Sequence, residues 1–342
     1  MQEPRRGPSG LLLLFSRSTL LTLVVLLGGV SPAFAREFRL GLITPPSHLW
    51  TEAAIAFGDE LEVASGSSHR LAVFPARQLG TEAQLLQLLQ TGALDFAILT
   101  ISEITNRMPE FGAFYAPYLV ADVGAAAELL RGDVAREMLL SMPEEIGVFG
   151  VGYGMAGMRQ ILGRDTIRTA ADLRGKKLRI TPFVPIRDFY QLLGAAPTPM
   201  PLASVYDALA NGQIDAIDMD LEVIWKLKYY DYAETLVLSN HMMFPCVGVI
   251  SGKTWLALAE DERELVSRLL RKHLDRVMSA YVEKEREWAT AIREAGVALI
   301  EVGPEFFGTT LEEWEAIWSV KAPTLATLKA EAAANASKAT TP

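Results

Sequence analysis

Cysteine is nearly absent from this chain: only Cys246 occurs among 342 residues. A single cysteine cannot form an intramolecular disulfide, so covalent cross-links do not stabilise the fold. Half of the residues are hydrophobic, which is enough to build a sizeable core instead. We therefore expect Cys246 to be a small apolar residue of that core.

Motifs of enzymes and of nucleic-acid-binding proteins are also missing. The sequence contains no H-E-x-x-H, no G-x-S-x-G and no phosphate-binding glycine loop. It has a formal charge of -9 and no lysine-rich stripe with interleaved aromatic residues, which argues against a nucleic-acid partner. The sequence therefore predicts neither catalysis nor a cofactor. The histidines are dispersed along the chain: His48, His69, His241 and His273.

A long apolar run, of the kind found in signal peptides or membrane spans, occurs only near the start of the chain. Arg5 and Arg6 precede an apolar run from Leu20 to Val30, and the small residues Ala33 and Ala35 follow it. This order is typical of a secretory signal peptide, and the run is too short to span a bilayer. We predict that residues 1–35 are removed and that the mature protein is periplasmic, with no membrane span.

A pattern of strand, helix, glycine and strand occurs twice in the remaining chain. "LQTGALDFAI" and "LANGQIDAID" share leucine, glycine, aspartate and alanine in register, with Gly92 and Gly212 at matching places. A strand ending at proline precedes each match, "RLAVFP" in the first and "KKLRITP" in the second. The repeat predicts two similar α/β lobes.

Helical periodicity dominates the last third of the chain. It extends from Ala259 to Gly296, which corresponds to a helix on the order of 50 Å long that can cross from one lobe to the other. A final helix is predicted from Thr310 to about Ala333. We place lobe I at 36–155 plus 245–285, lobe II at 156–244 plus 286–330, and a frayed tail at 331–342, with the connections near Tyr153 and Pro245.

Arg179 alternates with Leu178 and Ile180 at the end of a short strand. Its side chain therefore points away from the face that those two residues share. A guanidinium at the end of a strand presents a planar charged fork that suits a carboxylate. The other interpretation of a single arginine is an ordinary surface residue.

The stretches "FPARQLGTEAQLLQLLQTGALDFAI", "GMRQILGRDTIRTAADLRGKKLRI" and "LGAAPTPMPLASVYDALANGQIDAID" resemble the solute-binding proteins of tripartite ATP-independent periplasmic (TRAP) transporters, of the C4-dicarboxylate type. The resemblance covers nearly the whole mature chain. It implies a type II-like periplasmic-binding-protein fold, in which two α/β lobes with a hinge close over one small ligand. It also implies delivery of that ligand to integral-membrane permease subunits.

The resemblance implies roles for two arginines. In the family, an arginine in the strand of "GKKLRI" makes a bidentate contact with the ligand carboxylate, and this position is Arg179. A second family arginine matches Arg159 in "GMRQ", for which a surface ion pair is the alternative. We also include His48, Thr100 and Met219 in the predicted ligand site, because binding proteins place polar groups at strand ends that face the cleft.

The chain departs from the family pattern in "IDMDLEVIW", where relatives carry neutral groups. Asp218, Asp220 and Glu222 replace those groups. If one of them faces the cleft, the ligand carries a cationic group or is bridged by a metal cation. Otherwise they form a solvated acidic loop. The sequence leaves open whether the ligand is a dicarboxylate, a 2-oxo acid, a hydroxy acid or a zwitterion, and a periplasmic enzyme or a ligand sensor remains the alternative function.

Overall fold

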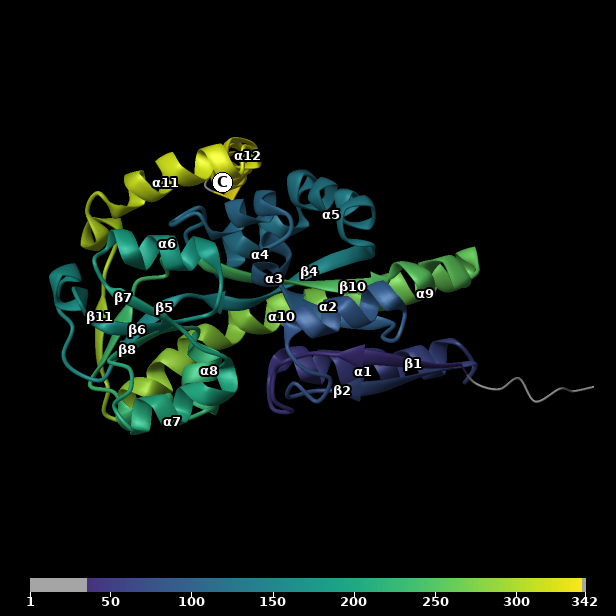
Figure 1. Cartoon of the computed structure of the whole chain (residues 1–342), viewed down its shortest axis with the longest axis horizontal. Helices are drawn as coiled ribbons and strands as arrows, with labels where there is room; N and C mark the ends of the chain where they lie inside the picture. Colours follow the sequence, from purple (N-terminus) through teal and green to yellow (C-terminus); the bar gives the residue numbers. More distant parts are fainter. Residues whose placement is uncertain (1–35, 340–342) are drawn as a thin grey trace, which may run out of the picture. The chain divides into compact units, whose positions relative to one another are not determined.

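The computed structural model describes residues 36–339, which form one compact unit built around two β-sheets. The predicted signal peptide at 1–35 and the last residues of the predicted tail, 340–342, lie outside the described part. Figure 1 shows the two groups of strands side by side with helices around them. The predicted two-lobed α/β organisation is thus confirmed, and we call the part around the first sheet lobe I and the part around the second lobe II.

The sheet of lobe I contains five strands. β1 forms because Phe38 and Leu40 alternate with the more exposed Glu37 and Arg39, so that one face is buried. All five residues of its neighbour β3 are buried. The order across the sheet is β2 (His69–Phe74), β1 (Arg36–Gly41), β3 (Phe96–Thr100), β10 (Met243–Ser251) and β4 (Val148–Met158).

The sheet of lobe II contains six short strands. β6 pairs in parallel with β7 and β8, whereas β5 pairs antiparallel with β8 and β9. The order across the sheet is β11 (Ala298–Glu301), β9 (Thr235–Leu238), β5 (Gln160–Gly163), β8 (Ala216–Met219), β6 (Lys177–Ile180) and β7 (Ala196–Pro199).

The repeat seen in the sequence is a repeat in the fold. Gly92 and Gly212 both adopt positive φ, 74° and 69°, where glycine is the least strained residue. Three residues later, Asp95 accepts a hydrogen bond from the backbone N–H of Arg39 (2.9 Å), as Asp215 does from Lys177 (2.7 Å). Each aspartate therefore ties the start of the third strand of its lobe to the middle strand.

The sequence match was wrong about which strands correspond. The proline after each strand pairs "KKLRITP", β6, with "RLAVFP", β2. The sheet orders β2-β1-β3 and β7-β6-β8 instead make β6 the counterpart of β1. A proline after a strand carries no information about the position of that strand in a sheet, whereas the hydrogen bonds of Asp95 and Asp215 identify the middle strand in each lobe.

Twelve α-helices surround the sheets in the described residues. Several helix ends follow capping rules: Thr81 and Gln84 form the capping box that begins α2, and Gly92 ends the helix. The helices are α1 (Leu49–Ala64), α2 (Glu82–Thr91), α3 (Ile101–Thr105), α4 (Val123–Arg131), α5 (Asp133–Ile146), α6 (Val184–Leu192), α7 (Val205–Ala210), α8 (Leu221–Lys226), α9 (Gly252–Ala257), α10 (Glu260–Glu294), α11 (Thr310–Lys321) and α12 (Thr324–Ala339).

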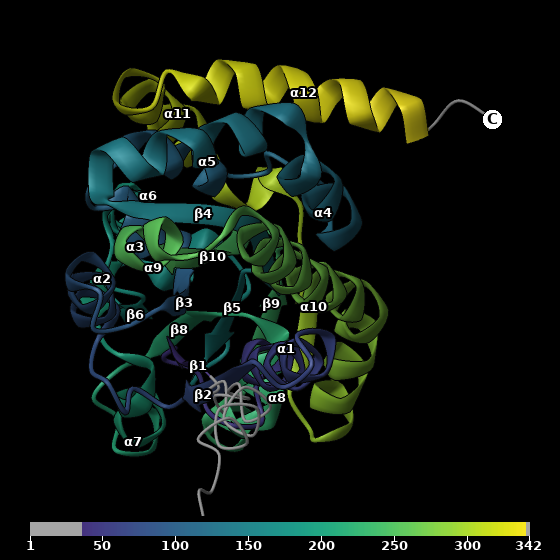
Figure 2. The same cartoon turned by 90° about the vertical axis from the view of Figure 1, so that its right-hand side faces the viewer.

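The long helix α10 serves both lobes. It packs on α1 and β4 in lobe I and on α8 in lobe II (Figures 1 and 2). Its bounds, Glu260–Glu294, agree with the predicted helix between Ala259 and Gly296. The prediction of a long helix that spans both lobes is confirmed.

The chain passes between the two sheets at Arg159 and again between β9 and β10. Arg159 is the single residue between β4 and β5, and its backbone N–H donates to the carbonyl of Met242 (2.7 Å). The two crossings therefore lie side by side and form a hinge. Tyr153 and Pro245, which mark the predicted connections, are instead paired within the sheet of lobe I.

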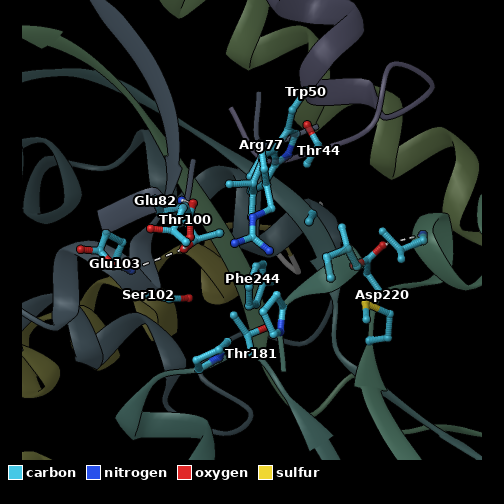
Figure 3. A pocket seen from close by; sticks show the side chains of 18 of the residues that line it. Thr44, Trp50, Arg77, Glu82, Thr100, Ser102, Glu103, Thr181, Asp220 and Phe244 are labelled. Atoms are coloured by element: carbon cyan, nitrogen blue, oxygen red, sulfur yellow. Dashed lines mark hydrogen bonds between the residues drawn. The ribbon is translucent and has the colours of Figure 1, made fainter. Parts of the chain in front are cut away.

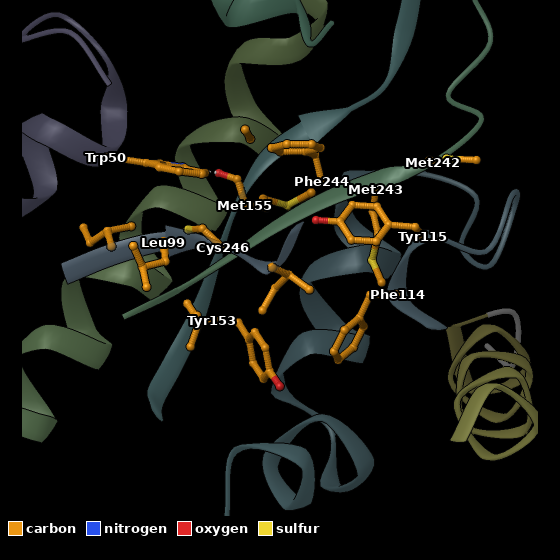
Figure 4. Packing of buried hydrophobic residues seen from close by; sticks show 14 of the residues in the cluster. Trp50, Leu99, Phe114, Tyr115, Tyr153, Met155, Met242, Met243, Phe244 and Cys246 are labelled. Atoms are coloured by element: carbon orange, nitrogen blue, oxygen red, sulfur yellow. Dashed lines mark hydrogen bonds between the residues drawn. The ribbon is translucent and has the colours of Figure 1, made fainter. Parts of the chain in front are cut away.

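The hydrophobic core continues beneath this hinge. Cys246 is fully buried, and Figure 4 shows it on β10 among Leu99, Met155 and Tyr153. Burial raises the pKa of its thiol well above the ordinary value, which agrees with the predicted core role.

The C-terminal segment differs from the prediction. The expected single helix from Thr310 is two helices, because Pro323 interrupts it. The frayed tail from 331 is also wrong for residues 331–339, which continue α12. Glu331 accepts hydrogen bonds from the backbone N–H groups of Asp133 and Val134 at the start of α5. No helix in residues 36–339 is long and apolar enough to cross a membrane.

Candidate functional site

A cavity of about 260 Å³ lies between the two lobes. This is close to the lower end of small-molecule pockets, about 300 Å³. Its wall combines strand ends and helix starts of both lobes, because β3 leads into α3 and β8 leads into α8 at this place. All six residues of the predicted ligand site line it: His48, Thr100, Arg159, Arg179, Met219 and Asp220.

Arg179 lies on β6 and is 2% exposed. Its Nε and Nη2 both donate to the carbonyl of Met200 (3.0 and 2.8 Å), whereas Nη1 has no hydrogen-bond partner among the described residues. Burial, and secondarily the nearby charge of Arg159, lowers the pKa of Arg179 to about 10. The guanidinium is therefore cationic at neutral pH, uncompensated by an ion pair, and has one nitrogen available to an acceptor.

Arg159 is also buried, but each of its three guanidinium nitrogens has a hydrogen-bond acceptor. Its Nε donates to Asp218 Oδ1 (2.6 Å), its Nη1 to Asp220 Oδ2 (3.3 Å), and its guanidinium lies 4.4 Å from the ring centroid of Phe244. Burial opposes its charge, yet the two carboxylates outweigh this effect and hold the pKa of Arg159 above its ordinary value. The surface ion pair that we considered for Arg159 is wrong, because the pair is buried.

Asp218 anchors a buried network at the hinge. Its Oδ2 accepts from the hydroxyl of Tyr190 (2.9 Å) and lies 3.2 Å from Nε2 of His241. Burial raises the pKa of Asp218, but Arg159 and His241 more than reverse this and leave it at about 2. Asp218 is not among the residues that line the cavity. It holds the guanidinium of Arg159 from outside the cavity.

Asp220 lines the cavity and begins α8. Its Oδ1 accepts from the backbone N–H of Val223 (2.9 Å), as an N-cap residue does. Burial raises its pKa to about 6, even though Arg159 lowers it, and the nearby Glu222 adds to the rise. The hypothesis of a solvated acidic loop is therefore wrong: Asp218, Asp220 and Glu222 are all at most 2% exposed.

Thr100 is the counterpart of Asp220 in lobe I, since it ends β3 and caps α3. Its backbone N–H and its hydroxyl both donate to the carboxylate of Glu82 (2.6 and 2.8 Å). Burial raises the pKa of Glu82 to about 7, although these two hydrogen bonds act against the rise. The hydroxyl hydrogen of Thr100 is thus committed to Glu82.

His48 caps α1, accepting at Nδ1 from the backbone N–H of Trp50 (3.1 Å), and is buried. Its Nε2 lies 3.4 Å from Glu222 of lobe II. Burial lowers the pKa of His48 to about 4, although Glu222 favours the charged form. Glu222 also accepts from the backbone N–H of Leu49 (2.8 Å) and from the hydroxyl of Tyr281, so that it joins α1, α8 and α10 at one edge of the cavity.

The sequence reasoning missed several polar or aromatic residues of the cavity, among them three charged residues and one phenylalanine. Figure 3 shows Arg77 in the middle of the view, with Glu82 and Thr100 on one side and Asp220 on the other. Arg77 follows β2 by three residues, so its position after a predicted strand could have indicated it. No comparable sequence pattern indicated three further lining residues: Glu82, Glu103 and Phe244. Phe114 and Tyr115 are buried in the core (Figure 4).

Side chains that commonly bind metal ions are not clustered in the described part of the chain. Among residues 36–339, no group of three or more histidine, cysteine, aspartate or glutamate side chains is arranged to hold a metal ion. The acids nearest the cavity already have partners: Asp220 has Arg159, and Glu82 has Thr100.

Comparison with known proteins agrees with this architecture. Residues 40–321 match the family model of bacterial extracellular solute-binding protein, family 7. A solute-binding protein of Roseobacter denitrificans is 27% identical over 80% of this chain and 84% of its own length. The sialic acid-binding periplasmic protein of Vibrio cholerae is 23% identical over 81% and 86%. A TRAP periplasmic solute-binding protein from a Bradyrhizobium strain, solved with galacturonate, superposes with a TM-score of 0.80 at 28% identity, covering 87% of this chain and 99% of that chain.

Proposed function

Because the chain belongs to bacterial extracellular solute-binding protein family 7, we propose that it captures a small organic acid between its lobes, with the ligand carboxylate held by Arg179. The ligand is then delivered to the membrane permease of a TRAP transporter. In this proposal residues 1–35 direct the protein to the periplasm, the compartment that the printed names of two relatives give.

The observation that carries the proposal is the unpartnered Nη1 of Arg179. A buried cation with a free donor is costly, since buried polar groups are normally hydrogen-bonded. A carboxylate that enters the cavity supplies both the missing acceptor and the missing charge. Because Met200 holds the other two nitrogens, the guanidinium is already fixed in place before the ligand arrives.

Members of this family are solute-binding proteins, and the cavity supports binding rather than turnover. His48 and His241, the histidines at or beside the cavity, both have a lowered pKa and hydrogen-bond partners. We therefore expect an acid that is incubated with the protein for many hours to be recovered with unchanged mass.

Titration calorimetry with a panel of acids tests the clamp. The panel contains D-galacturonate, D-galactonate, orotate, pantoate, succinate and adipate. We expect Arg179→Ala to weaken the tightest acid by about 100-fold or more, because the ligand carboxylate then lacks its charged partner. Arg179→Lys should rescue poorly, since an ammonium cannot reproduce the planar fork.

Arg174→Ala is the matched control, because Arg174 is an exposed arginine of the same lobe outside the cavity. It should bind the acid like the wild type. Near-normal affinity of the Arg179→Ala variant, or no binding of any acid by the wild type, would contradict the proposal.

A further inference from the structure

The start of helix α1 in lobe I is completed by a residue of lobe II. The first backbone N–H groups of a helix have no partner within that helix. The cap residue His48 accepts from Trp50 through its Nδ1 (3.1 Å) and from Thr51 through its carbonyl (2.9 Å). The N–H of Leu49 donates instead to Oε1 of Glu222 (2.8 Å). This hydrogen bond breaks if the two lobes move apart.

Glu222 is fully buried in the first turn of α8. Its carboxylate faces the start of α1, where the helix dipole favours a negative charge. Lys226, one turn later on α8, lies 2.9 Å from Oε1 of Glu222 and supplies the compensating charge. The hydroxyl of Tyr281 on α10 also donates to the carboxylate. These partners fix the carboxylate toward lobe I.

Lys226 makes a second bond between the lobes. Its Nζ donates to the carbonyl of Ser47 and lies 3.6 Å from the carboxylate of Glu52. Ser47 directly precedes the cap residue of α1, so both interlobe bonds converge on the beginning of the same helix. We call Glu222, Lys226 and the segment 47–52 the interlobe latch.

The interlobe latch lies at one edge of the cavity. His48 and Trp50, on either side of Leu49, line the cavity, and so does Val223, the residue after Glu222. Both α1 and α8 pack on α10 (Figure 2). The guanidinium that we propose as the carboxylate clamp is buried, so a ligand reaches it only after the lobes have moved apart.

We propose that the interlobe latch holds the lobes closed through bonds within the chain, and that ligand entry and ligand release both require it to open. None of its bonds involves a ligand atom, so the latch favours closure equally before and after binding. It therefore slows exchange in both directions and changes the affinity much less. This inference rests on the proposed function, since it assumes that the ligand binds in the cavity.

Leu49→Pro tests the latch because it removes the N–H that Glu222 accepts and changes no charge. Proline is well tolerated at the first position of a helix. His48, the residue before it, already has the extended φ and ψ, -81° and 143°, that a residue preceding proline adopts. Leu49→Ala is the matched control, because it also removes the leucine side chain but keeps the N–H.

Stopped-flow fluorescence with the tightest acid of the calorimetry panel measures both rate constants, and Trp50 in the cavity wall provides the signal. We expect Leu49→Pro to raise the association and the dissociation rate constants by about 10-fold or more each, because a hydrogen bond to a charged group is lost. The Kd should stay within about 5-fold of the wild type. Leu49→Ala should change both rate constants by less than about 3-fold.

Lys226→Ala is an independent variant, because it removes the bond to Ser47 and leaves the backbone of α1 unchanged. It should raise both rate constants in the same direction as Leu49→Pro, and it decides the question if Leu49→Pro does not fold. Lys284→Ala, which removes an exposed lysine of α10, is its control and should exchange ligand like the wild type.

The distance between the lobes is measured on the protein alone. Spin labels at the substitutions Val63→Cys and Ala203→Cys, exposed positions of lobe I and lobe II outside the cavity, report this distance. Cys246 is buried and does not compete for the label. We expect one distance in the wild type and in Leu49→Ala, and an additional longer distance in Leu49→Pro.

The outcomes separate the latch from the proposed function. Unchanged or slower association in Leu49→Pro and Lys226→Ala, or a longer distance already present in the wild type, overturns the latch and leaves the clamp at Arg179 intact. Faster dissociation with a proportional loss of affinity also overturns it, because the contact then forms only in the complex. If the distances shift as expected but no acid binds, the proposed function is wrong, and of the latch only the closure of the lobes stands.

Discussion

Arg159 and Arg179 line the same cavity, yet they differ in their hydrogen-bond and ion-pair partners. Arg159 has two carboxylate partners and a raised pKa, whereas Arg179 has a backbone carbonyl, a pKa lowered to about 10 and a free Nη1. Arg159 also occupies the crossing between β4 and β5. Burial and position in the cavity are therefore not enough to identify a ligand contact; the unfilled hydrogen bond is what distinguishes Arg179.

The largest effect that separates the two arginines concerns stability. Arg159→Met leaves Asp218 as a buried charge without its cation, which costs about 3–5 kcal/mol. Arg179→Met removes a cation that no acid neutralises, so we expect its free energy of unfolding to lie within about 1 kcal/mol of the wild type or above it. Urea unfolding of the ligand-free proteins measures both values.

The double variant Arg159→Met/Asp218→Asn is the control for this measurement. It should recover part of the lost stability, because the buried charge is removed together with its partner. Equal destabilisation by Arg159→Met and Arg179→Met would remove the distinction that we draw between the two arginines.

The two aspartates that face Arg159 should have a smaller effect, which concerns how the free energy of unfolding depends on pH. Their pKa values are shifted in opposite directions. The pKa of Asp218 is lowered to about 2, so its contribution to stability is present above the ordinary pKa of 3.8 and is lost as the pH falls through 2. The pKa of Asp220 is raised to about 6, so its contribution is present below 3.8 and is lost as the pH rises through 6.

Urea unfolding between pH 2 and pH 7 tests this contrast. Relative to Asp220→Asn, the wild type should lose on the order of 3 kcal/mol between pH 4 and pH 7. Relative to Asp218→Asn, it should instead lose on the order of 2 kcal/mol as the pH falls from 4 to 2. The same direction of change for both variants would show that Arg159 does not discriminate between the two acids.

The sequence predicts features of the fold that depend on neighbouring residues better than features that depend on contacts between distant segments. Local patterns correctly identified the matching glycines Gly92 and Gly212 and the long helix α10. They failed for the correspondence of β6, because strand order is set by hydrogen bonds between distant segments such as that of Asp215 to Lys177.

The site shows the same limit. Arg179 was indicated by its own strand and by the resemblance of that strand to a known family. The burial of Asp218 and Asp220 was not predictable, since it depends on Arg159, which lies some sixty residues earlier in the chain. Arg77 was overlooked because the turn that directs it into the cavity is fixed by hydrogen bonds to the segment after β1.

The most direct test of the central claim is a crystal structure of the complex with the tightest acid of the panel. The account predicts a carboxylate oxygen of the ligand at about 2.7–2.9 Å from Nη1 of Arg179, the distance of a charge-assisted hydrogen bond. Asp218 should remain on Arg159 in that complex. A ligand whose carboxylate lies elsewhere, with Nη1 of Arg179 still without a partner, would contradict the account.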